Sequence, residues 1–255
     1  MKEDVFVLFN EFGDNNVPCL LLLHGMMQDW RSEYEILKPL EKHYRLIIPA
    51  QDGFYDGSSD FTCFADQARQ IEEYIIQNHS GKVQGAYGAS QGGLMLTELL
   101  SRNKIDLGTV IMDGCYVAHQ GKLAGIITSK MFIRYKNTGK FPDLIMLMMK
   151  KMGLTEDELG MMNALYLNAS DETIKRNFIE NYTYRPRKEI SQNNTMVHMW
   201  CGSKEPYAIK SHNILKKYLK NCKEEIMDGY GHGEFLMKHS DECCKKIHDT
   251  ISKKI

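Results

Sequence analysis

One serine of the chain lies between glycines where a short apolar segment meets a helix-forming run. The segment Gly88-Ala89-Ser90-Gln91-Gly92 is followed by another glycine and an apolar stretch. The flanking glycines leave room for a turn so tight that the serine is forced into strained backbone space. Such a turn presents the hydroxyl group at a helix N-terminus, which makes Ser90 a candidate nucleophile. The alternative is an ordinary glycine-rich turn, so this interpretation depends on partners for Ser90.

A serine hydroxyl needs a general base within hydrogen-bond reach, and the base needs a third group to orient it. His232 suits the role of base, because it lies between two glycines in a loop after a predicted strand. Glu205 follows another predicted strand and is the candidate acid. The order Ser90, Glu205, His232 is the chain order of enzymes that carry such a turn. Asp113, directly after a third strand, is the competing acid.

Acyl transfer also requires an oxyanion hole, which is a pair of N–H groups aimed at the oxygen where negative charge develops. The N–H group of Gln91 comes directly after the candidate nucleophile, at the start of the helix. The segment "LLLLHGMMQDW" places His24, Gly25 and a loop after an apolar strand, and the N–H group of Met26 is the second candidate. His24 is expected to be a structural hydrogen-bonding residue rather than a second base.

The other histidines and the cysteines show no pattern of a metal site. Five histidines lie in or near helices and are expected at the surface: His43, His79, His212, His239 and His248. The seven cysteines are scattered, and none of their spacings resembles a zinc-binding pair. The sequence therefore predicts no metal. The odd number of cysteines and their scattered positions favour a reduced, cytoplasmic protein.

Short apolar strands and longer helices alternate along the chain and must position these residues. Strands are predicted at 5–9, 19–23, 45–49, 82–87, 109–112, 195–200 and 224–227, and helices at 31–43, 64–78, 94–101 and 207–220. The run Cys19-Leu20-Leu21-Leu22-Leu23 is typical of a strand that is buried on both faces. The alternation predicts an α/β fold with a mostly parallel sheet that is flanked by helices on both faces.

Residues 115–190 interrupt the alternation, because they separate two successive late strands by far more than a crossover helix needs. The segment Thr155-Glu156-Asp157-Glu158 has the form of a capping box, and Ser170 is a candidate cap of the next helix. Since this insertion leaves the carboxyl edge of the sheet, where α/β proteins bind ligands, we expect a helical lid. The predicted organisation is a core of residues 1–114 and 191–255 with a lid at 115–190.

Composition and net charge indicate which kinds of molecule the protein binds. The chain of 255 residues is 43% hydrophobic and 25% charged, as in an ordinary globular protein. A formal net charge of -1 argues against electrostatic binding of nucleic acid or of an anionic membrane. The first residues show no signal-peptide pattern, and no apolar run is long enough for a membrane span. We therefore expect a small-molecule substrate, with the protein a monomer or homodimer.

Taken together, the motifs resemble the α/β-hydrolase superfamily, specifically the lidded haloperoxidase-type esterases and carbon–carbon bond hydrolases. The likeness runs over nearly the whole length and rests on "FNEFGDNNVPCLLLLHG", "IIPAQDGFYDGSSD", "GASQGG", "MWCGSKEP" and "GYGHGEFL". The resemblance implies no metal and no organic cofactor. The family usually has aspartate at the position of Glu205. Haloalkane dehalogenases and epoxide hydrolases carry aspartate at the position of Ser90, so their chemistries are excluded.

The expected function is that of a serine hydrolase that cleaves a small-to-medium apolar ester or thioester through an acyl-enzyme on Ser90. Seven of the 16 methionines fall between Met131 and Met162, and such flexible side chains suit an adaptable apolar pocket. A helix that only packs its apolar face on the core explains the same pattern. Two other functions stay open, namely carbon–carbon bond hydrolysis by the same triad and a ligand sensor with a vestigial triad.

Overall fold

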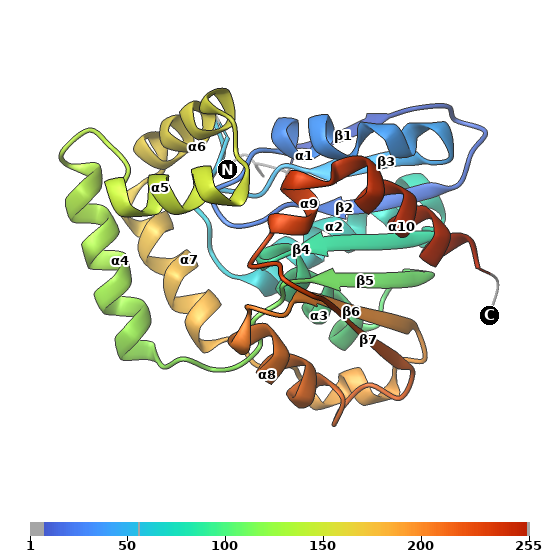
Figure 1. The fold of residues 1–255 in the computed structure, drawn as a ribbon. Helices are drawn as coiled ribbons and strands as arrows, with labels where there is room; N and C mark the ends of the chain where they lie inside the picture. The colour runs from blue at the N-terminus through green and yellow to red at the C-terminus, as the bar shows by residue number, and fades with distance from the viewer. Residues whose placement is uncertain (1–7, 56, 254–255) are drawn as a thin grey trace, which may run out of the picture.

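The computed structural model describes residues 8–55 and 57–253 of the chain. Helices and strands alternate along most of this length (Figure 1). In chain order the elements are β1 (Phe9–Phe12), β2 (Cys19–Leu23), α1 (Trp30–Leu37), η1 (Lys38–Lys42), β3 (Arg45–Pro49), α2 (Phe64–His79), β4 (Gly85–Ala89), α3 (Gln91–Arg102), β5 (Thr109–Asp113), α4 (Lys122–Lys136), α5 (Asp143–Met152), α6 (Glu156–Asn168), α7 (Asp171–Thr183), η2 (Lys188–Gln192), β6 (Met196–Gly202), α8 (Pro206–Leu215), β7 (Cys222–Met227), α9 (Glu234–Lys238) and α10 (Ser240–Ser252).

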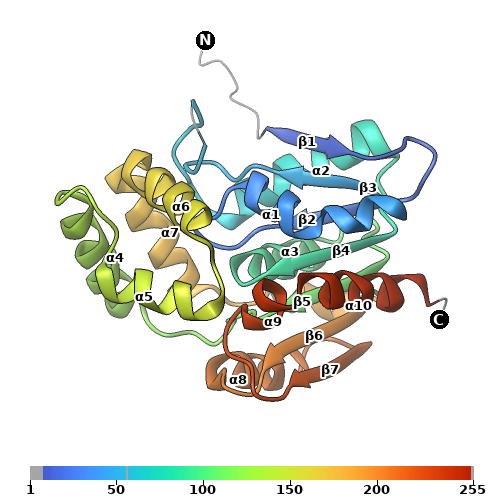
Figure 2. The same ribbon diagram turned by 45° about the horizontal axis from the view of Figure 1, so that its top comes forward.

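Within the described residues, seven strands form one sheet in the order β1-β3-β2-β4-β5-β6-β7. The edge strand β1 pairs with β3 in antiparallel fashion, and every other neighbouring pair is parallel. Helices cover both faces (Figures 1 and 2). In β2, Leu20 and Leu22 pack toward α1 and α10, whereas Leu21 and Leu23 pack toward α2 and α3. The predicted mostly parallel α/β fold is confirmed, because successive side chains of a strand point to opposite faces and both faces are buried.

Some element boundaries differ from the predictions. The strand predicted at 82–87 is found at 85–89, because ladder pairing with both neighbours begins at Gly85, and Lys82 makes only an isolated bridge to Asp106. Of the strand predicted at 5–9, residues 5–7 lie outside the described residues, and β1 begins at Phe9. The helix predicted at 31–43 divides into α1 and η1 near Pro39, because proline has no N–H group to donate in a helix interior.

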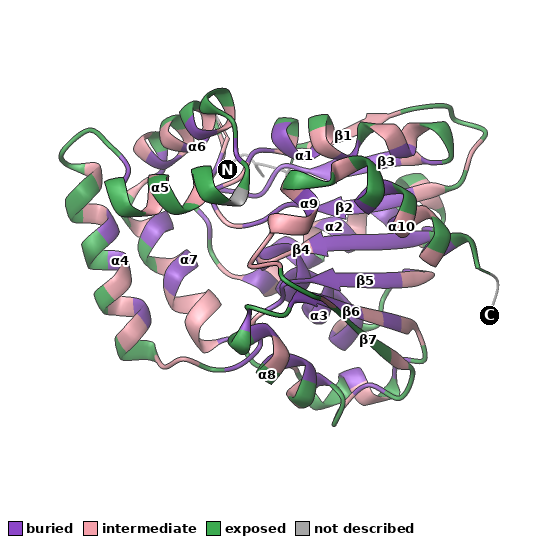
Figure 3. Ribbon diagram, viewed as in Figure 1, coloured by how far each residue is buried: buried purple, intermediate pink, exposed green. Residues whose placement is uncertain are grey.

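The insertion between β5 and β6 contains the four helices α4, α5, α6 and α7. Thr155 and Glu158 form the predicted capping box of α6, and Ser170 caps α7 through the N–H group of Thr173. Helices α4 and α7 pack together, with the rings of Phe132 and Phe178 separated by 4.6 Å. The central strands are almost fully buried, whereas the outer surfaces of α4 and α5 are exposed (Figure 3). The insertion therefore packs around a small apolar cluster that is distinct from the two faces of the sheet and that also includes Met27 and Phe54.

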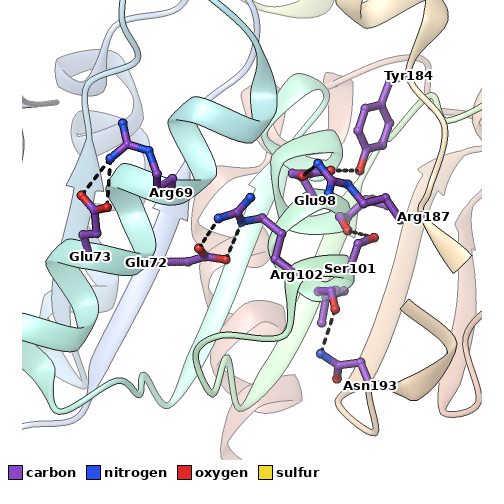
Figure 4. Close-up of polar contacts among 11 residues, drawn as sticks. Arg69, Glu72, Glu73, Glu98, Ser101, Arg102, Tyr184, Arg187 and Asn193 are labelled. Atoms are coloured by element: carbon purple, nitrogen blue, oxygen red, sulfur yellow. Dashed lines mark hydrogen bonds and ion pairs between the residues drawn. The ribbon is translucent and has the colours of Figure 1, made fainter. Parts of the chain in front are cut away.

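A buried polar cluster attaches the end of this insertion to α3 (Figure 4). Glu98 of α3 is 2% exposed, and it accepts a hydrogen bond of 3.1 Å from the Tyr184 hydroxyl group. Arg187 lies 2.7 Å from the same carboxylate, and Arg102 binds Glu72 of α2 through two hydrogen bonds of 2.8 Å. Such charge-assisted bonds are roughly twice as strong as neutral ones. The contacts of Tyr184 and Arg187 with Glu98 fix the end of the insertion against α3, which begins directly after Ser90, and the Arg102–Glu72 pair joins α3 to α2.

Candidate active site

Ser90 lies in the strained turn that the glycine spacing predicts. Its backbone has φ 53° and ψ -112°, which non-glycine residues rarely adopt. A Cβ atom on Gly88 would lie 2.5 Å from the carbonyl carbon of Gly92, and one on Gly92 would lie 1.9 Å from the carbonyl oxygen of Leu23. The N–H group of Ser90 donates to the carbonyl oxygen of Asp113 at 2.7 Å. Both glycines are therefore required for the strand and helix to approach so closely.

The structure brings Ser90, His232 and Glu205 into one chain of hydrogen bonds. Nε2 of His232 lies 3.0 Å from Oγ of Ser90, and Nδ1 lies 2.6 Å from Oε2 of Glu205. An ionised carboxylate only accepts hydrogen bonds, so Nδ1 carries the proton and the lone pair of Nε2 faces the serine hydroxyl. Three separate loops, after β4, β6 and β7, supply these side chains. The arrangement can withdraw a proton from Ser90 and stabilise the resulting imidazolium.

The carboxylate of Glu205 is buried and accepts several hydrogen bonds. Its side chain is 2% exposed, and it also accepts hydrogen bonds from the N–H group of Gly202 at 2.7 Å and the hydroxyl group of Tyr116 at 3.0 Å. Burial alone would raise its pKa, but the bonds from His232, Gly202 and Tyr116 hold the pKa below its usual value. Glu205 is therefore ionised at neutral pH.

The competing acid, Asp113, has a different environment. It ends β5, and its Oδ2 atom accepts a hydrogen bond of 2.9 Å from the hydroxyl group of Tyr87. Burial raises the pKa of Asp113 to about 6, although the bond from Tyr87 opposes the shift. The orienting hydrogen bond to His232 comes from Glu205, so the geometry favours Glu205 over Asp113 as the third member of the chain.

Two residues beside this chain of hydrogen bonds are absent from the sequence prediction. Gly114 has φ +61°, and a Cβ atom there would lie 2.9 Å from the His232 ring and 3.2 Å from Oε2 of Glu205. The Tyr116 ring lies 4.9 Å from the His232 ring, between centroids. Their positions directly after β5, in "MDGCY", are the only sequence signal for either residue. Gly114 leaves space for the imidazole, and Tyr116 packs against it.

The loop that carries Met26 lies against Ser90. A Cβ atom on Gly25 would be 3.6 Å from Cβ of Ser90, and the N–H group of Gly25 donates to Oε1 of Gln28 at 2.8 Å. His24 hydrogen-bonds the Gly25 carbonyl through Nδ1 at 3.0 Å, and burial lowers the pKa of His24. These contacts fit the structural role expected of His24.

Gln91 lies at the first turn of α3 and connects three segments through its side chain. It donates to Oε1 of Gln51 and accepts a hydrogen bond of 2.7 Å from Asn181 of α7. Within the described part of the chain, the backbone N–H groups of Met26 and Gln91 donate to no protein acceptor. Two unpaired N–H groups next to Ser90 are what an oxyanion hole requires. The sequence does not predict Gln51 or Asn181 at the site, because their contacts depend on how a loop and a helix that are distant in sequence pack against α3.

An apolar pocket with a volume of about 200 Å³ opens beside Ser90 and His232. Its apolar lining comes from both the core and the insertion: Met26, Met149, Leu154, Met162, Leu236 and Met237. Helix α5 divides its methionines, since Met149 lines the pocket and Met148 is 53% exposed on the outer surface. The insertion therefore contributes part of the wall of the pocket beside Ser90.

The expectations about the histidines, the cysteines and the long helices can also be compared with the structure. His212, expected at the surface, is 1% exposed, because α8 directs it toward the sheet, where Nδ1 lies 3.0 Å from Glu224. All seven cysteines are free. Among the described residues, no group of His, Cys, Asp or Glu side chains is arranged to hold a metal ion. In the same ranges, no helix combines the length and the apolar character that a membrane span requires.

Comparisons with solved structures agree with the fold described above. A carboxylesterase structure from Nitrososphaera gargenis is similar with a TM-score of 0.75 and 14% identity, covering 98% of this chain and 96% of that one. MenH from S. aureus has a TM-score of 0.75 and 14% identity, covering 95% and 97%. An enol-lactonase from Burkholderia xenovorans LB400 has a TM-score of 0.74 and 13% identity, covering 97% and 96%. At such identities the likeness shows a shared fold.

Comparisons of the sequence identify the family. No curated protein matches the chain. The family model of the alpha/beta hydrolase fold matches residues 18–237, a range that includes Ser90, Glu205 and His232. The chain therefore belongs to the α/β-hydrolase family.

Proposed function

We propose that this protein is a serine hydrolase that cleaves a small-to-medium apolar ester or thioester through an acyl-enzyme on Ser90. The observation that carries the proposal is the series of hydrogen bonds from Ser90 through His232 to Glu205. Ser90 and His232 also line an apolar pocket. Carboxylesterases and an enol-lactonase among the solved structures of the same fold agree with an ester-like substrate.

In the proposed reaction, Oγ of Ser90 attacks the carbonyl carbon while its proton moves to Nε2 of His232. Glu205 holds the imidazole ring and stabilises its protonated form. The N–H groups of Met26 and Gln91 stabilise the oxyanion of the tetrahedral intermediate. His232 then protonates the leaving group, and an acyl-enzyme forms. A water molecule deprotonated by His232 releases the acid and restores Ser90.

The pocket limits the acyl group to an apolar one of moderate size. Burying a charge without a partner is costly, and the carboxyl group of Asp113 in the pocket wall would repel an anionic acyl group. Methionine side chains have several rotatable bonds, so Met149 and Met162 can move to admit somewhat longer chains. We assign residues 115–190 as a lid over the core of residues 1–114 and 191–255, and the lid moves when substrate enters.

A fluorophosphonate probe together with p-nitrophenyl esters of two to twelve carbons tests the proposal. The wild-type protein should be labelled on Ser90 and should hydrolyse the shorter esters. A Ser90→Ala variant, which differs by one oxygen atom, should lose labelling and lower turnover by a factor on the order of 10⁴ or more. Residual activity above a few per cent would show that Ser90 is not the nucleophile. Labelling with poor ester turnover would instead favour carbon–carbon bond hydrolysis, and neither labelling nor turnover would favour a sensor.

A further inference from the structure

A second row of hydrogen-bonded side chains lies at the end of the sheet opposite to Ser90. Cys19 begins β2, His79 ends α2, and Glu11 lies in β1. Sγ of Cys19 is 3.3 Å from Nδ1 of His79, and Nε2 of His79 is 2.6 Å from Oε1 of Glu11. Ser90 follows the carboxyl end of β4, whereas Cys19 lies at the amino end of β2, so the two sites are separate.

The protonation of His79 follows from the surroundings of Glu11. Oε1 of Glu11 also accepts a hydrogen bond of 2.5 Å from the Tyr74 hydroxyl group, and Oε2 accepts one from Nε of Arg45. Burial would raise the pKa of Glu11, but the bonds from Tyr74, His79 and Arg45 hold the pKa below its usual value. An ionised carboxylate cannot donate, so Nε2 of His79 carries the proton. In the neutral ring, the lone pair of Nδ1 therefore faces the Cys19 thiol.

The groups have the same roles here as at the Ser90 site. At His79, however, Nδ1 faces the nucleophile and Nε2 faces the carboxylate, whereas at His232 the two nitrogens are the other way round. The imidazole can accept the thiol proton, and the carboxylate stabilises the imidazolium. Burial and the charge of Glu11 raise the pKa of the Cys19 thiol, so the thiolate needs His79 as its base. A thiol of high pKa is a strong nucleophile once it loses its proton.

Cys19 is partly buried and lines a surface depression. The same depression is lined by Asn15, Arg45, Asn78 and His79, among others. Arg45 keeps 26% of its side chain exposed there. Glu11 also lines the depression, and Nε of Arg45 is paired with its carboxylate. The other N–H groups of the guanidinium and the amide groups of Asn15 and Asn78 can donate hydrogen bonds to carboxylates, so the depression suits a small molecule that carries carboxylate groups.

We propose that Cys19 is a modification site that undergoes exchange with low-molecular-weight disulfides that carry carboxylate groups. Sγ of Cys19 attacks one sulfur of the disulfide while Nδ1 of His79 accepts the thiol proton. A bond forms between Sγ and the attacked sulfur, and the original S–S bond breaks. The departing thiolate takes the proton from His79 and leaves as a thiol. The disulfide itself is the oxidant, and the exchange is reversible by an excess of thiol.

Two other cysteines are matched internal controls. Cys63 and Cys222 are half-buried like Cys19, and burial raises the pKa of each thiol. Their described contacts include no histidine ring, and Sγ of Cys222 faces the carbonyl oxygen of Leu219. Faster exchange at Cys19 than at both of these thiols is therefore not explained by exposure. The neighbouring charges also differ among the three cysteines, so the His79→Gln variant isolates the contribution of the imidazole.

The experiment incubates the reduced full chain with oxidised glutathione and follows the adduct on each cysteine by quenching, digestion and mass spectrometry. Cys19 should react about tenfold faster than Cys63 and Cys222, or more, because a positioned general base contributes roughly 10² to 10⁴. His79→Gln should slow Cys19 by about tenfold or more and leave Cys63 unchanged. Tyr74→Phe, which removes a neighbouring hydroxyl group but not the base, should stay within about threefold of wild type.

Equal rates at Cys19 and the two control thiols in the wild-type protein would overturn the proposal, as would an unchanged rate in a folded His79→Gln variant. The buried Cys115 and Cys201 report on folding in the same spectra, since they should stay unmodified. If they react in the variant, the wild-type comparison alone decides. A Ser90→Ala protein should exchange at Cys19 at the wild-type rate, which separates this site from the proposed hydrolase.

Discussion

Tyr116 donates a hydrogen bond of 3.0 Å to Oε2 of Glu205, the same oxygen atom that accepts from Nδ1 of His232. Tyr116 thus helps to hold the carboxylate beside the imidazole, and it comes from the loop after β5 rather than from the loop of Glu205. The acid of the proposed triad is therefore positioned by two strands.

Replacing Tyr116 with phenylalanine should reduce kcat about threefold to tenfold and leave KM nearly unchanged, because one hydrogen bond to a charged group is lost. The bond from Tyr116 lowers the pKa of Glu205, so without it the carboxylate is more basic and stabilises the imidazolium more strongly. The acidic limb of the kcat profile, which belongs to the coupled pair of His232 and Glu205, should therefore move to higher pH. Steady-state kinetics from pH 4 to pH 8 would measure both effects. An unshifted acidic limb would show that Tyr116 has no influence on the acid.

Glu205→Gln and Asp113→Asn distinguish the two candidate acids. Loss of the orienting charge at Glu205 should lower kcat by roughly 10²- to 10⁴-fold. Asp113 hydrogen-bonds Tyr87 instead of the imidazole, so its amide variant should stay within about tenfold of wild type. The comparison is made with one ester under identical conditions, and circular dichroism checks that both variants are folded. A larger loss at Asp113 would reverse the assignment.

Met149 and Met148 are adjacent in α5 but differ in environment, which makes them a matched pair. Met149→Ser should lower kcat/KM for medium-chain esters by about threefold to thirtyfold, because it removes apolar surface from the pocket wall. Met148→Ser changes a side chain that is 53% exposed and should leave the chain-length preference as it is. Kinetics over acyl chains of two to twelve carbons would reveal the difference. Equal behaviour of the two variants would show that the lid does not select the acyl group.

Glu33 should make the protein less stable as pH rises. Burial and the neighbouring charge of Asp113 raise the pKa of Glu33 from its ordinary value of 4.5 to about 8. The folded state then binds this proton more tightly than the unfolded state. Its stabilising contribution is complete below pH 4.5 and is lost as the pH rises toward 8, by up to about 1.4 kcal/mol per pH unit.

Urea denaturation of the wild type and a Glu33→Gln variant between pH 5 and pH 9 would test this dependence. The glutamine keeps the shape of the side chain but does not ionise, so the free energy of unfolding should fall less steeply with pH in the variant. Parallel curves for the two proteins would mean that Glu33 has an ordinary pKa.

Local features of the sequence were sufficient to predict the tight turn at Ser90 and the sheet. Glycines at 88 and 92 predict the tight turn because only residues without a Cβ atom fit there, and this requirement is independent of the rest of the fold. The continuous leucine run of β2 predicts burial on both faces for a similarly local reason. Chain order then placed Ser90, Glu205 and His232 at one edge, since parallel strands end together.

The tertiary structure alone decided which neighbours complete the site. Gly114, Tyr116 and Asn181 lie on a loop and a helix whose approach to His232 and Gln91 depends on packing between distant segments. The choice between Glu205 and Asp113 is of the same kind, because both follow strands at the same edge and only the direction of each side chain separates them. The contact between His79 and Cys19 joins residues 60 positions apart. Sequence patterns record spacing along one element, whereas such contacts arise from the angle and distance at which elements meet.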